Sequence, residues 1–463
     1  MPQLHDDTFA QALRRAAGYE KRPASIEERL AEIPPAESLA DLPAGTPVWI
    51  RADLDVADHD GVIGDDPRLA SLHETLELGR RHGWRMLVFG HRGRSAESTL
   101  EYVHQRLREL EPGCGPFIRD WFDEHAETLT GVAVKGVESL KPGQFLVMEN
   151  VRRYDFERRL WTATEEQLPA LTAHFGRVAA AMRQGATVYI NDAIASGNKD
   201  FSTTAMPLAM GRTALGVFSR RELAEHVVRA REAGLVCFSG MKLDKLKQLH
   251  GVVARGHVEL ILAGGGLAMA LLKASGERGG RRVSIGAAGD PVHREAKAYV
   301  PATAVEQARR LLETAERRNV RVVLPIDFVL DDGTVADDIP PDAWQRDIGP
   351  RTRVLFDEEA RTWAAATKRP VAFHNGVMGQ FENSAFAGGT EALIGTLKAL
   401  QTAGVAVYVG GGEGRAALER YGRLGDVTHA FTAGGTILKC LADEPLPFLE
   451  ALAAQAIGRG PAA

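Results

Sequence analysis

The sequence has few cysteines and no excess of positive charge. Cys114, Cys237 and Cys440 lie far apart along the chain, so they predict neither a disulfide framework nor a CxxC metal site. The formal net charge is -5, and Lys and Arg are scattered rather than clustered. That distribution gives no electrostatic footprint for nucleic acid or for an anionic membrane. We therefore expect small-molecule ligands and a reducing, cytoplasmic location.

The sequence also lacks long apolar runs. Its first residues, "MPQLHDDTFAQALRRAAGYEKRP", have no apolar core of a signal peptide, and no window approaches the length of a membrane span. We expect a soluble, monomeric, intracellular protein without nucleic-acid or membrane partners. With 463 residues the chain is too long for one ordinary core, which predicts two domains.

The sequence does contain a repeated pattern, in which a short apolar run is followed by a polar or glycine-rich loop and then by a helical segment. Continuous apolar runs indicate strands buried on both faces, and their alternation with helices indicates parallel sheets. We expect an α/β fold with two doubly wound, Rossmann-like parallel-sheet domains joined by a hinge helix. After "VWIRADLDV" (48–56), the runs are "WRMLVFG" (84–90), "GQFLVMEN" (143–150), "ATVYIND" (186–192), "GLVCFSG" (234–240), "VELILAGGG" (258–266), "VRVVLPID" (320–327), "RPVAFHNG" (369–376) and "VAVYVGGG" (405–412).

The domain boundary is predicted at a charged helical pattern, "FSRRELAEHVVRAREAG" (218–234). The end of the chain has helical character, and we expect it to pack back on the first domain. The expected divisions are an N-terminal extension (1–40), a first domain (41–218), an interdomain helix (219–234), a second domain (235–440) and a C-terminal segment (441–463).

Charged side chains follow the apolar runs of the first half. Ligands of open α/β sheets bind outside the carboxyl ends of the strands, so these side chains would surround one site. Several Arg and a His suit a small anion with a carboxylate or phosphate, because a guanidinium pairs with two of its oxygens. Taken singly, each is more often a surface ion pair or a cap, and Asp192 fits either a loop cap or the site. The residues are Arg51, Asp53, Asp55, Arg68, His91, Arg94, Arg152, Arg153, Asn191, Asp192 and Lys199.

Glycines follow the apolar runs of the second half. They allow backbone amides to approach phosphate groups at helix N-termini, so together they favour nucleotide binding. None of these segments is a Walker A loop, and none is a GxGxxG motif in the first βαβ unit. The segments are "LILAGGGLAMALL", "AFHNGVMGQFEN", "YVGGGEGRAAL" and "FTAGGTILK".

The order of these motifs resembles that of the phosphoglycerate kinase family over roughly residues 45 to 445. The resemblance is collinear and rests on "RADLDV", "DDPRL", "GHRGR", "MENVR", "YINDA", "SGMK", "LAGGGLAMALL", "VVLPIDFVL", "RDIGPRT", "HNGVMGQFE", "VGGGEG" and "TAGG". It implies that the first domain binds 3-phosphoglycerate, the second binds Mg-ATP or Mg-ADP, and hinge closure joins them.

The resemblance also implies roles for the acid-binding residues. Asp53 and Arg68 match positions that orient the carboxyl end of the acid, and Arg68 is catalytic because it stabilises the transferring phosphoryl group. His91, Arg94 and Arg152 match the cluster that holds the distant phosphate. Asp55 and Lys199 complete the expected substrate-binding set.

On the nucleotide side, Lys242 matches the catalytic lysine that neutralises charge during transfer. Asn375 and Glu382 match nucleotide-contacting positions, and either Lys245 or Lys247 would be the second lysine. Glu413 is the expected Mg²⁺ position. The matching glycines are Gly240, Gly264, Gly265, Gly266, Gly411, Gly412, Gly434 and Gly435.

Several positions depart from the family pattern. Asp55 replaces an asparagine and adds negative charge to a pocket for an anion, and Asn198 and Lys199 replace a histidine and an arginine. Lys does not reproduce the forked donors of Arg. At the metal position, Glu413 replaces an aspartate and Gly414 replaces a hydroxyl residue.

Three hypotheses remain open from the sequence. The first is a phosphotransferase with a carboxyl acceptor, nominally a phosphoglycerate kinase that interconverts 3-phosphoglycerate and 1,3-bisphosphoglycerate with ATP. The second is a related enzyme that activates a different carboxylic or amino acid, with ligation to an amine as a following step. The third is a non-catalytic nucleotide-binding scaffold, and the retention of Arg68, His91, Arg94 and Lys242 argues against it.

Overall fold

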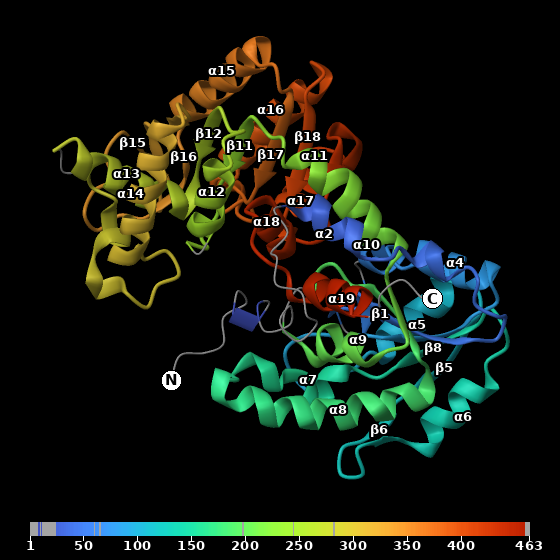
Figure 1. Cartoon of the computed structure of the whole chain (residues 1–463). Coiled ribbons are helices and arrows are strands. Elements are labelled where there is room, and N and C mark those ends of the chain that lie inside the picture. The colour runs from blue at the N-terminus through green and yellow to red at the C-terminus, as the bar shows by residue number, and fades with distance from the viewer. Residues whose placement is uncertain are drawn as a thin grey trace. The chain divides into compact units, whose positions relative to one another are not determined.

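The chain forms two units in a computed structural model, whose elements are labelled in Figure 1. Unit 1 comprises residues 1–224 and 444–463, and unit 2 comprises residues 225–443. The structure describes residues 8–9, 11, 25–59, 61–63, 66–196, 199–243, 245–280 and 283–458.

Unit 1 contains a parallel sheet to which six strands contribute within the described residues, in the order β10-β9-β1-β4-β8-β5. The chain order reverses beside β1, because β4 pairs with one edge of this strand and β9 with the other. The strands are β1 (Pro47–Ala52), β4 (Arg85–Phe89), β5 (Cys114–Ile118), β8 (Phe145–Met148), β9 (Val188–Asp192) and β10 (Arg212–Leu215).

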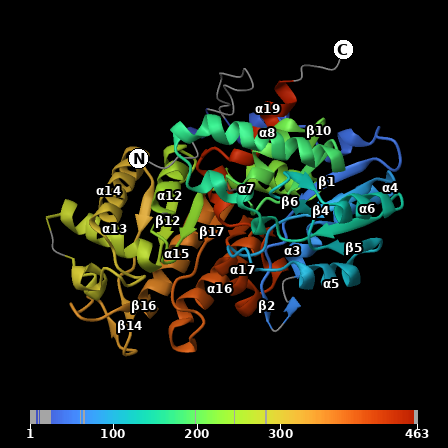
Figure 2. The same cartoon turned by 90° about the horizontal axis from the view of Figure 1, so that it is seen from below.

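Both faces of the unit 1 sheet are covered by helices, which explains why its strands are apolar without alternation. Val48 and Ile50 of β1 share one core with Leu76 of α4 (His73–Arg81) and Leu107 of α5 (Glu101–Leu110). Trp49 points to the opposite face, where its Nε1 donates to Met182 O of α8 (Leu168–Gly185), 3.0 Å away. Helices α5 and α8 lie on opposite sides of this sheet in Figure 2.

Shorter elements complete the described part of unit 1. Two small antiparallel pairs are β2 (Asp58–His59) with β3 (Val62–Ile63), and β6 (Phe122–Asp123) with β7 (Thr128–Leu129). The remaining helices include α2 (Ile26–Glu32), α3 (Asp66–Ala70), α6 (Gly131–Ser139), α7 (Asp155–Arg158), α9 (Ala205–Ala209), α10 (Val217–Arg221) and α19 (Pro447–Ile457).

Unit 2 repeats the architecture of a parallel sheet between helices. Within the described residues its sheet has the order β13-β12-β11-β17-β18-β19. The chain order reverses between β11 and β17, which places a crevice at the carboxyl ends of these two strands. The strands are β11 (Leu235–Phe238), β12 (Leu260–Ala263), β13 (Arg321–Val323), β17 (Val371–Asn375), β18 (Ala406–Gly410) and β19 (His429–Ala430).

One face of the unit 2 sheet packs on three helices, α15 (Pro350–Ala366), α16 (Gly388–Thr402) and α17 (Gly412–Tyr421), through a common apolar core. A small antiparallel sheet consists of β14 (Phe328–Leu330), β15 (Val335–Ala336) and β16 (Gln345–Ile348). Further helices are α11 (Val228–Ala230), α12 (Lys245–Ala254), α13 (Gly265–Arg278), α14 (Ala302–Arg317) and α18 (Gly435–Leu441).

The predicted fold class is confirmed, because both sheets are parallel and enclosed by helices. Each apolar run named from the sequence contains a strand of one of these two sheets. The sequence did not indicate β5 and β10, since "CGPFI" contains a glycine and a proline and "RTAL" is short. Among the described residues, no helix is long and apolar enough to span a bilayer.

The unit boundary falls inside a helical segment, in which α10 continues through a π-helical turn (Glu222–Val227) into α11. Helix α19, red in Figure 1, belongs to unit 1 and lies against α9. Glu450 of α19 accepts a hydrogen bond of 2.7 Å from Arg29 of α2, and both side chains are buried.

Replacing Glu450 by Ala should destabilise unit 1, because the Arg29 guanidinium would stay buried without this partner. Since Arg29 also pairs with Glu32, we expect a loss of about 2 kcal/mol, below the usual cost of breaking a buried pair. The midpoint of thermal unfolding should fall by several degrees. Glu32→Gln is the control, because its partly exposed carboxylate should contribute less than about 1 kcal/mol. Equal midpoints for the two variants would contradict the role of the buried pair.

Candidate active site

Charged side chains gather at the carboxyl end of the unit 1 sheet. Arg51 is the second-last residue of β1, His91 follows β4, Arg152 follows β8 and Asp200 follows β9. The side-chain amide of Asn150 holds the loop after β4 in place by donating to Arg92 O and Ser98 O. We use the term charge cluster for Arg51, Asp55, His91, Arg152, Glu157 and Asp200.

Arg51 is completely buried, and each nitrogen of its guanidinium has a partner. Its Nε donates to Ser202 Oγ (2.9 Å), its Nη1 to Ala52 O (2.8 Å) and its Nη2 to His91 Nδ1 (2.7 Å). The carboxylate of Asp200 lies 4.0 Å from Nη2. The charge that a buried strand tolerates least is thus compensated by the chain itself.

Arg152 and Asp200 form a second buried ion pair. Arg152 Nη2 lies 3.4 Å from Asp200 Oδ2, and Nη1 donates to Gly93 O (2.6 Å). The indole of Trp161 completes this arrangement, since the Arg152 guanidinium lies 4.7 Å from its ring and its Nε1 donates to Asp200 Oδ1 (2.6 Å). Arg152 Nε is buried without a hydrogen-bond partner among the described residues.

His91 and Asp55 form the third pair of the cluster. Burial and the nearby guanidinium groups lower the pKa of His91 to about 4, although Asp55 opposes this shift. Because Nδ1 accepts from Arg51, the neutral ring carries its proton on Nε2, which faces Asp55 Oδ2 at 3.6 Å. Burial disfavours the Asp55 carboxylate, but His91 and the Gly93 amide (2.7 Å) hold its pKa well below the usual range.

Glu157 and Ser202 link the cluster to the interior of unit 1. Both oxygens of Glu157 accept from Ser202, from its backbone amide (2.8 Å) and its hydroxyl (2.6 Å). Burial and the nearby Asp200 carboxylate raise the pKa of Glu157. Sequence reasoning missed Glu157, Asp200 and Trp161, which lie in loop and short helical segments without a strand signal.

Asp53 and Arg68 lie together beside the cluster. Arg68 Nε is 3.9 Å from Asp53 Oδ2, and Arg68 Nη1 donates to the backbone carbonyl of Asp55. Burial raises the pKa of Asp53, against the attraction of Arg68 and Arg51. Its Oδ1 is buried without a hydrogen-bond partner in the described part of the chain, so it could accept a hydrogen from a ligand.

The other residues expected on this side lie differently. Arg94 is exposed on the loop after β4, and Lys199 is half-buried beside Asp200. Asn198 lies outside the described residues. Asp192 is a cap rather than a ligand group, because it accepts from Thr75 Oγ1 (2.6 Å) and from the Ser219 amide in the first turn of α10 (2.8 Å).

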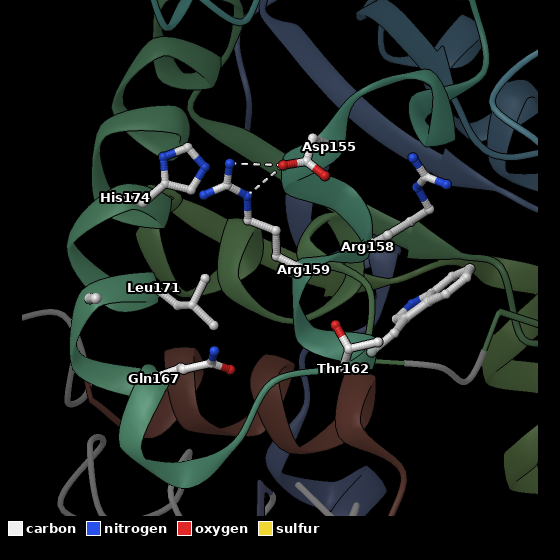
Figure 3. Close-up of a pocket in the computed structure, with 9 residues that line it drawn as sticks. Asp155, Arg158, Arg159, Thr162, Gln167, Leu171 and His174 are labelled. Carbon is white, nitrogen blue, oxygen red and sulfur yellow. Dashed lines mark hydrogen bonds and ion pairs between the residues drawn. The ribbon is translucent and has the colours of Figure 1, made fainter. Parts of the chain in front are cut away.

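A cavity of about 650 Å³ lies between α7 and α8. Trp161 separates it from Arg152 and Asp200 of the charge cluster. Figure 3 shows the hydrogen bond between Arg159 and Asp155, two of the cavity's lining residues, with His174 nearby. Trp161 lines this cavity and contacts Arg152 and Asp200. The cavity wall therefore adjoins the charge cluster, a relation that the sequence did not indicate.

A second pocket, of about 380 Å³, lies at the carboxyl ends of β11 and β17, where the strand order of the unit 2 sheet reverses. Several residues expected at the nucleotide line it, namely Lys242, Lys245, Asn375, Gly411, Gly412, Glu413, Gly434 and Gly435. Gln248, Gly376, Gly414, Leu438 and Lys439 also line it and were not predicted. Lys247 is exposed and is not among the lining residues.

Lys245 is held in this pocket by the end of β17. Its Nζ donates to Asn375 Oδ1 (2.7 Å), and Asn375 Nδ2 donates to Gly410 O of β18 (2.8 Å). This chain of contacts fixes an ammonium group at the carboxyl ends of two adjacent strands. A lysine there can act as a point charge toward a phosphate oxygen.

The glycines allow close contacts between the loops. Gly411 has a φ of +87°, and a Cβ at Gly434 would lie 3.0 Å from its Cα. Gly265 has a φ of +60°, and a Cβ there would lie 2.8 Å from the amide nitrogen of Gly240. Gly240, Gly264, Gly265 and Gly266 therefore shape the loop wall, although they are not among the pocket-lining residues.

Among the described residues that line the pocket, one carboxylate is available to a metal ion, that of Glu413 in the first turn of α17. A Cβ at Gly240 would lie 3.5 Å from Lys245 Nζ and 3.6 Å from Glu413 Oε2, so these two groups flank the same point. Mg²⁺ is commonly held by one or two carboxylates together with waters and substrate phosphates, so this donor set fits it. Glu382 is exposed and lies outside the lining residues.

Comparisons with known proteins agree on one family. A family model described as phosphoglycerate kinase matches residues 40–444. Phosphoglycerate kinase from Chloroflexus aggregans is 29% identical over 429 residues, covering 88% of this chain and 96% of that protein. The protein named cytosolic phosphoglycerate kinase from Triticum aestivum is 29% identical over 432 residues, with 89% and 96% covered.

Solved structures give the same result for the fold. Phosphoglycerate kinase from Coxiella burnetii matches with a TM-score of 0.67 at 25% identity, covering 89% of this chain and 98% of that one. The enzyme from Pyrococcus horikoshii matches with a TM-score of 0.71 at 23% identity, with 89% and 97% covered. The chain therefore belongs to the phosphoglycerate kinase family.

Proposed function

We propose that this protein transfers the γ-phosphoryl group of ATP to a carboxylate and so forms an acyl phosphate, with 3-phosphoglycerate as the family's reference acid. The observation that supports this most directly is the unit 2 pocket, where Lys242, Lys245 and Glu413 meet a glycine-rich wall. Such a pocket suits a nucleotide polyphosphate and its metal ion. We also propose a cytoplasmic location, in line with the cytosolic relative from wheat.

The chemistry needs charge screening more than proton transfer. A carboxylate oxygen attacks the γ-phosphorus, the bond to the β–γ bridging oxygen breaks, and ADP leaves with that electron pair. A carboxylate is already an adequate nucleophile, so no general base is required. Phosphoryl transfer is catalysed mainly by positioning and by cations around the transferring group.

The described residues divide these tasks between two surfaces. On unit 1, Arg68 would face the reacting carboxylate and the transferring group, held by Asp53 and the Asp55 carbonyl. On unit 2, Lys245 would bind phosphate oxygens from a position fixed by Asn375. Glu413 would hold Mg²⁺, which when bound neutralises charge on the nucleotide phosphates.

The direct test is to incubate the purified protein with Mg-ATP and a panel of carboxylic and amino acids. ADP release would be followed, and hydroxylamine would trap any acyl phosphate as a hydroxamate. We expect both products to form in equal amounts with at least one acid. ADP binding without either product for any acid would instead favour a non-catalytic scaffold.

Arg68→Ala should suppress turnover far more than it weakens nucleotide binding. The guanidinium stabilises charge that develops during transfer, so we expect kcat to fall by roughly 100-fold or more. The dissociation constant of a fluorescent ADP analogue should change little, because the nucleotide contacts lie in unit 2. Arg81→Ala, at an exposed position of α4, is the control. Unimpaired turnover of Arg68→Ala would remove this residue from the mechanism.

Glu413→Gln should weaken the magnesium dependence of nucleotide binding, because an amide is a poorer Mg²⁺ ligand than a carboxylate. We expect the Mg²⁺ concentration for half-maximal binding of the ADP analogue to rise by about tenfold. Glu419→Gln is the matched control, since Glu419 lies on the same helix and pairs with Arg415. Identical magnesium curves for the two variants would place the metal elsewhere.

A further inference from the structure

We infer that the acid accepted by unit 1 carries no phosphate group. This inference rests on the proposed function and narrows the class of its acid substrate. The observation behind it is that the charge cluster, whose arginines would be the natural partners of a phosphate, is neutralised by carboxylates of the same chain.

Both guanidinium groups of the cluster already make hydrogen bonds within the chain. Every nitrogen of the Arg51 guanidinium has a partner within the protein. Arg152 uses Nη1 for Gly93 O and directs Nη2 to Asp200. A phosphate dianion needs several charge-assisted hydrogen bonds to replace its hydration, and the N–H groups that remain on Arg51 and Arg152 lie beside the Asp200 carboxylate, which repels a second anion.

The charges of the cluster also balance at neutral pH. The Asp200 carboxylate lies beside the guanidinium groups of both Arg51 and Arg152, and the Asp55 carboxylate lies 3.6 Å from His91. His91 is neutral because burial lowers its pKa, and Glu157 adds no positive charge whether it is protonated or not. A bound phosphate would therefore add uncompensated negative charge to a buried site, which is unfavourable.

Trp161 fixes the position of Asp200 relative to Arg152. Its indole lies against the Arg152 guanidinium and donates to Asp200, so one side chain orients both partners. Asp200 is fully buried, with Oδ1 and Oδ2 both engaged. A ligand phosphate would have to displace this carboxylate to reach both arginines.

The remaining cations near the site do not restore a phosphate pocket. Arg94 is exposed, so its charge is screened by water and salt. Lys199, which precedes Asp200, is half-buried and brings a single ammonium charge without the forked donors of a guanidinium. Arg68 is already directed at Asp53 and the Asp55 carbonyl. Asp55 is 41% exposed and remains anionic, so the accessible part of the cluster can accept a hydroxyl or ammonium group.

Two matched pairs of acids test the inference by calorimetry with the whole protein, in the presence and absence of Mg-ADP. Glycerate and 3-phosphoglycerate differ by a phosphate, as do serine and phosphoserine. We expect the phosphorylated member of each pair to bind no more tightly than its partner, including the case in which neither binds measurably. Binding of 3-phosphoglycerate or phosphoserine at least about tenfold more tightly than its partner, a difference of about 1.4 kcal/mol, would overturn the inference.

A double variant, Asp55→Asn with Asp200→Ala, tests whether these carboxylates are the cause. Removing both should raise the affinity for 3-phosphoglycerate by about tenfold or more, because the two arginines would then be available. Asp155→Asn is the control, since this exposed carboxylate pairs with Arg159 outside the cluster (Figure 3). Asp55→Asn alone is included in case the double variant does not fold. A folded variant without any gain would contradict the stated cause.

Failure of this inference can be told apart from failure of the proposed function. If wild-type protein makes an acyl phosphate from 3-phosphoglycerate at least as fast as from glycerate, the function stands and the inference fails. If it makes no acyl phosphate from any acid, the proposed function fails, while the binding comparison still decides whether the site accepts phosphate.

Discussion

The structure of unit 1 depends on how the buried Arg51 guanidinium is compensated. A cation at the end of a strand with both faces covered costs free energy unless it is paired and hydrogen-bonded. Ser202, His91 and Asp200 provide that compensation. His91 follows β4, whereas Asp200 and Ser202 both follow β9. Satisfying one arginine therefore fixes the loops after β4 and β9 relative to β1.

The site of unit 2 consists mainly of glycines and lysines rather than arginines and carboxylates. Backbone atoms shape this site, because glycines let the loop after β11 approach the loop after β12, and the loop after β18 approach the loop after β19. One lysine of this site, Lys245, is held in place by its hydrogen bond to Asn375. Such a surface leaves backbone amides and an ammonium group available to a polyphosphate. By contrast, the guanidinium groups of Arg51 and Arg152 in unit 1 lie beside the Asp200 carboxylate. The two units therefore attract anions to different degrees, although they share one architecture.

The sequence predicted the sheets well because both depend on local apolar runs, which are visible without knowledge of contacts. It predicted less of the site, where burial depends on distant partners. Asp200 follows Lys199 in a polar loop and resembles a solvated residue, yet it is buried because Trp161 and Arg152 reach it from other segments. Arg94 was expected in the cluster and is exposed, since position after a strand does not fix where a long side chain points.

These contacts relate the departures from the family pattern to one another, because they bring carboxylates into the charge cluster. Asp55 is an isolated change in the sequence, but in the structure it pairs with His91 on the same cluster that Asp200 neutralises. The most direct measurement is a high-resolution crystal structure of the protein grown or soaked with inorganic phosphate. The pairing of both arginines with Asp200 predicts that this carboxylate remains beside Arg51 and Arg152 and that no phosphate contacts either guanidinium. A phosphate bound to both arginines, with Asp200 turned away, would contradict it.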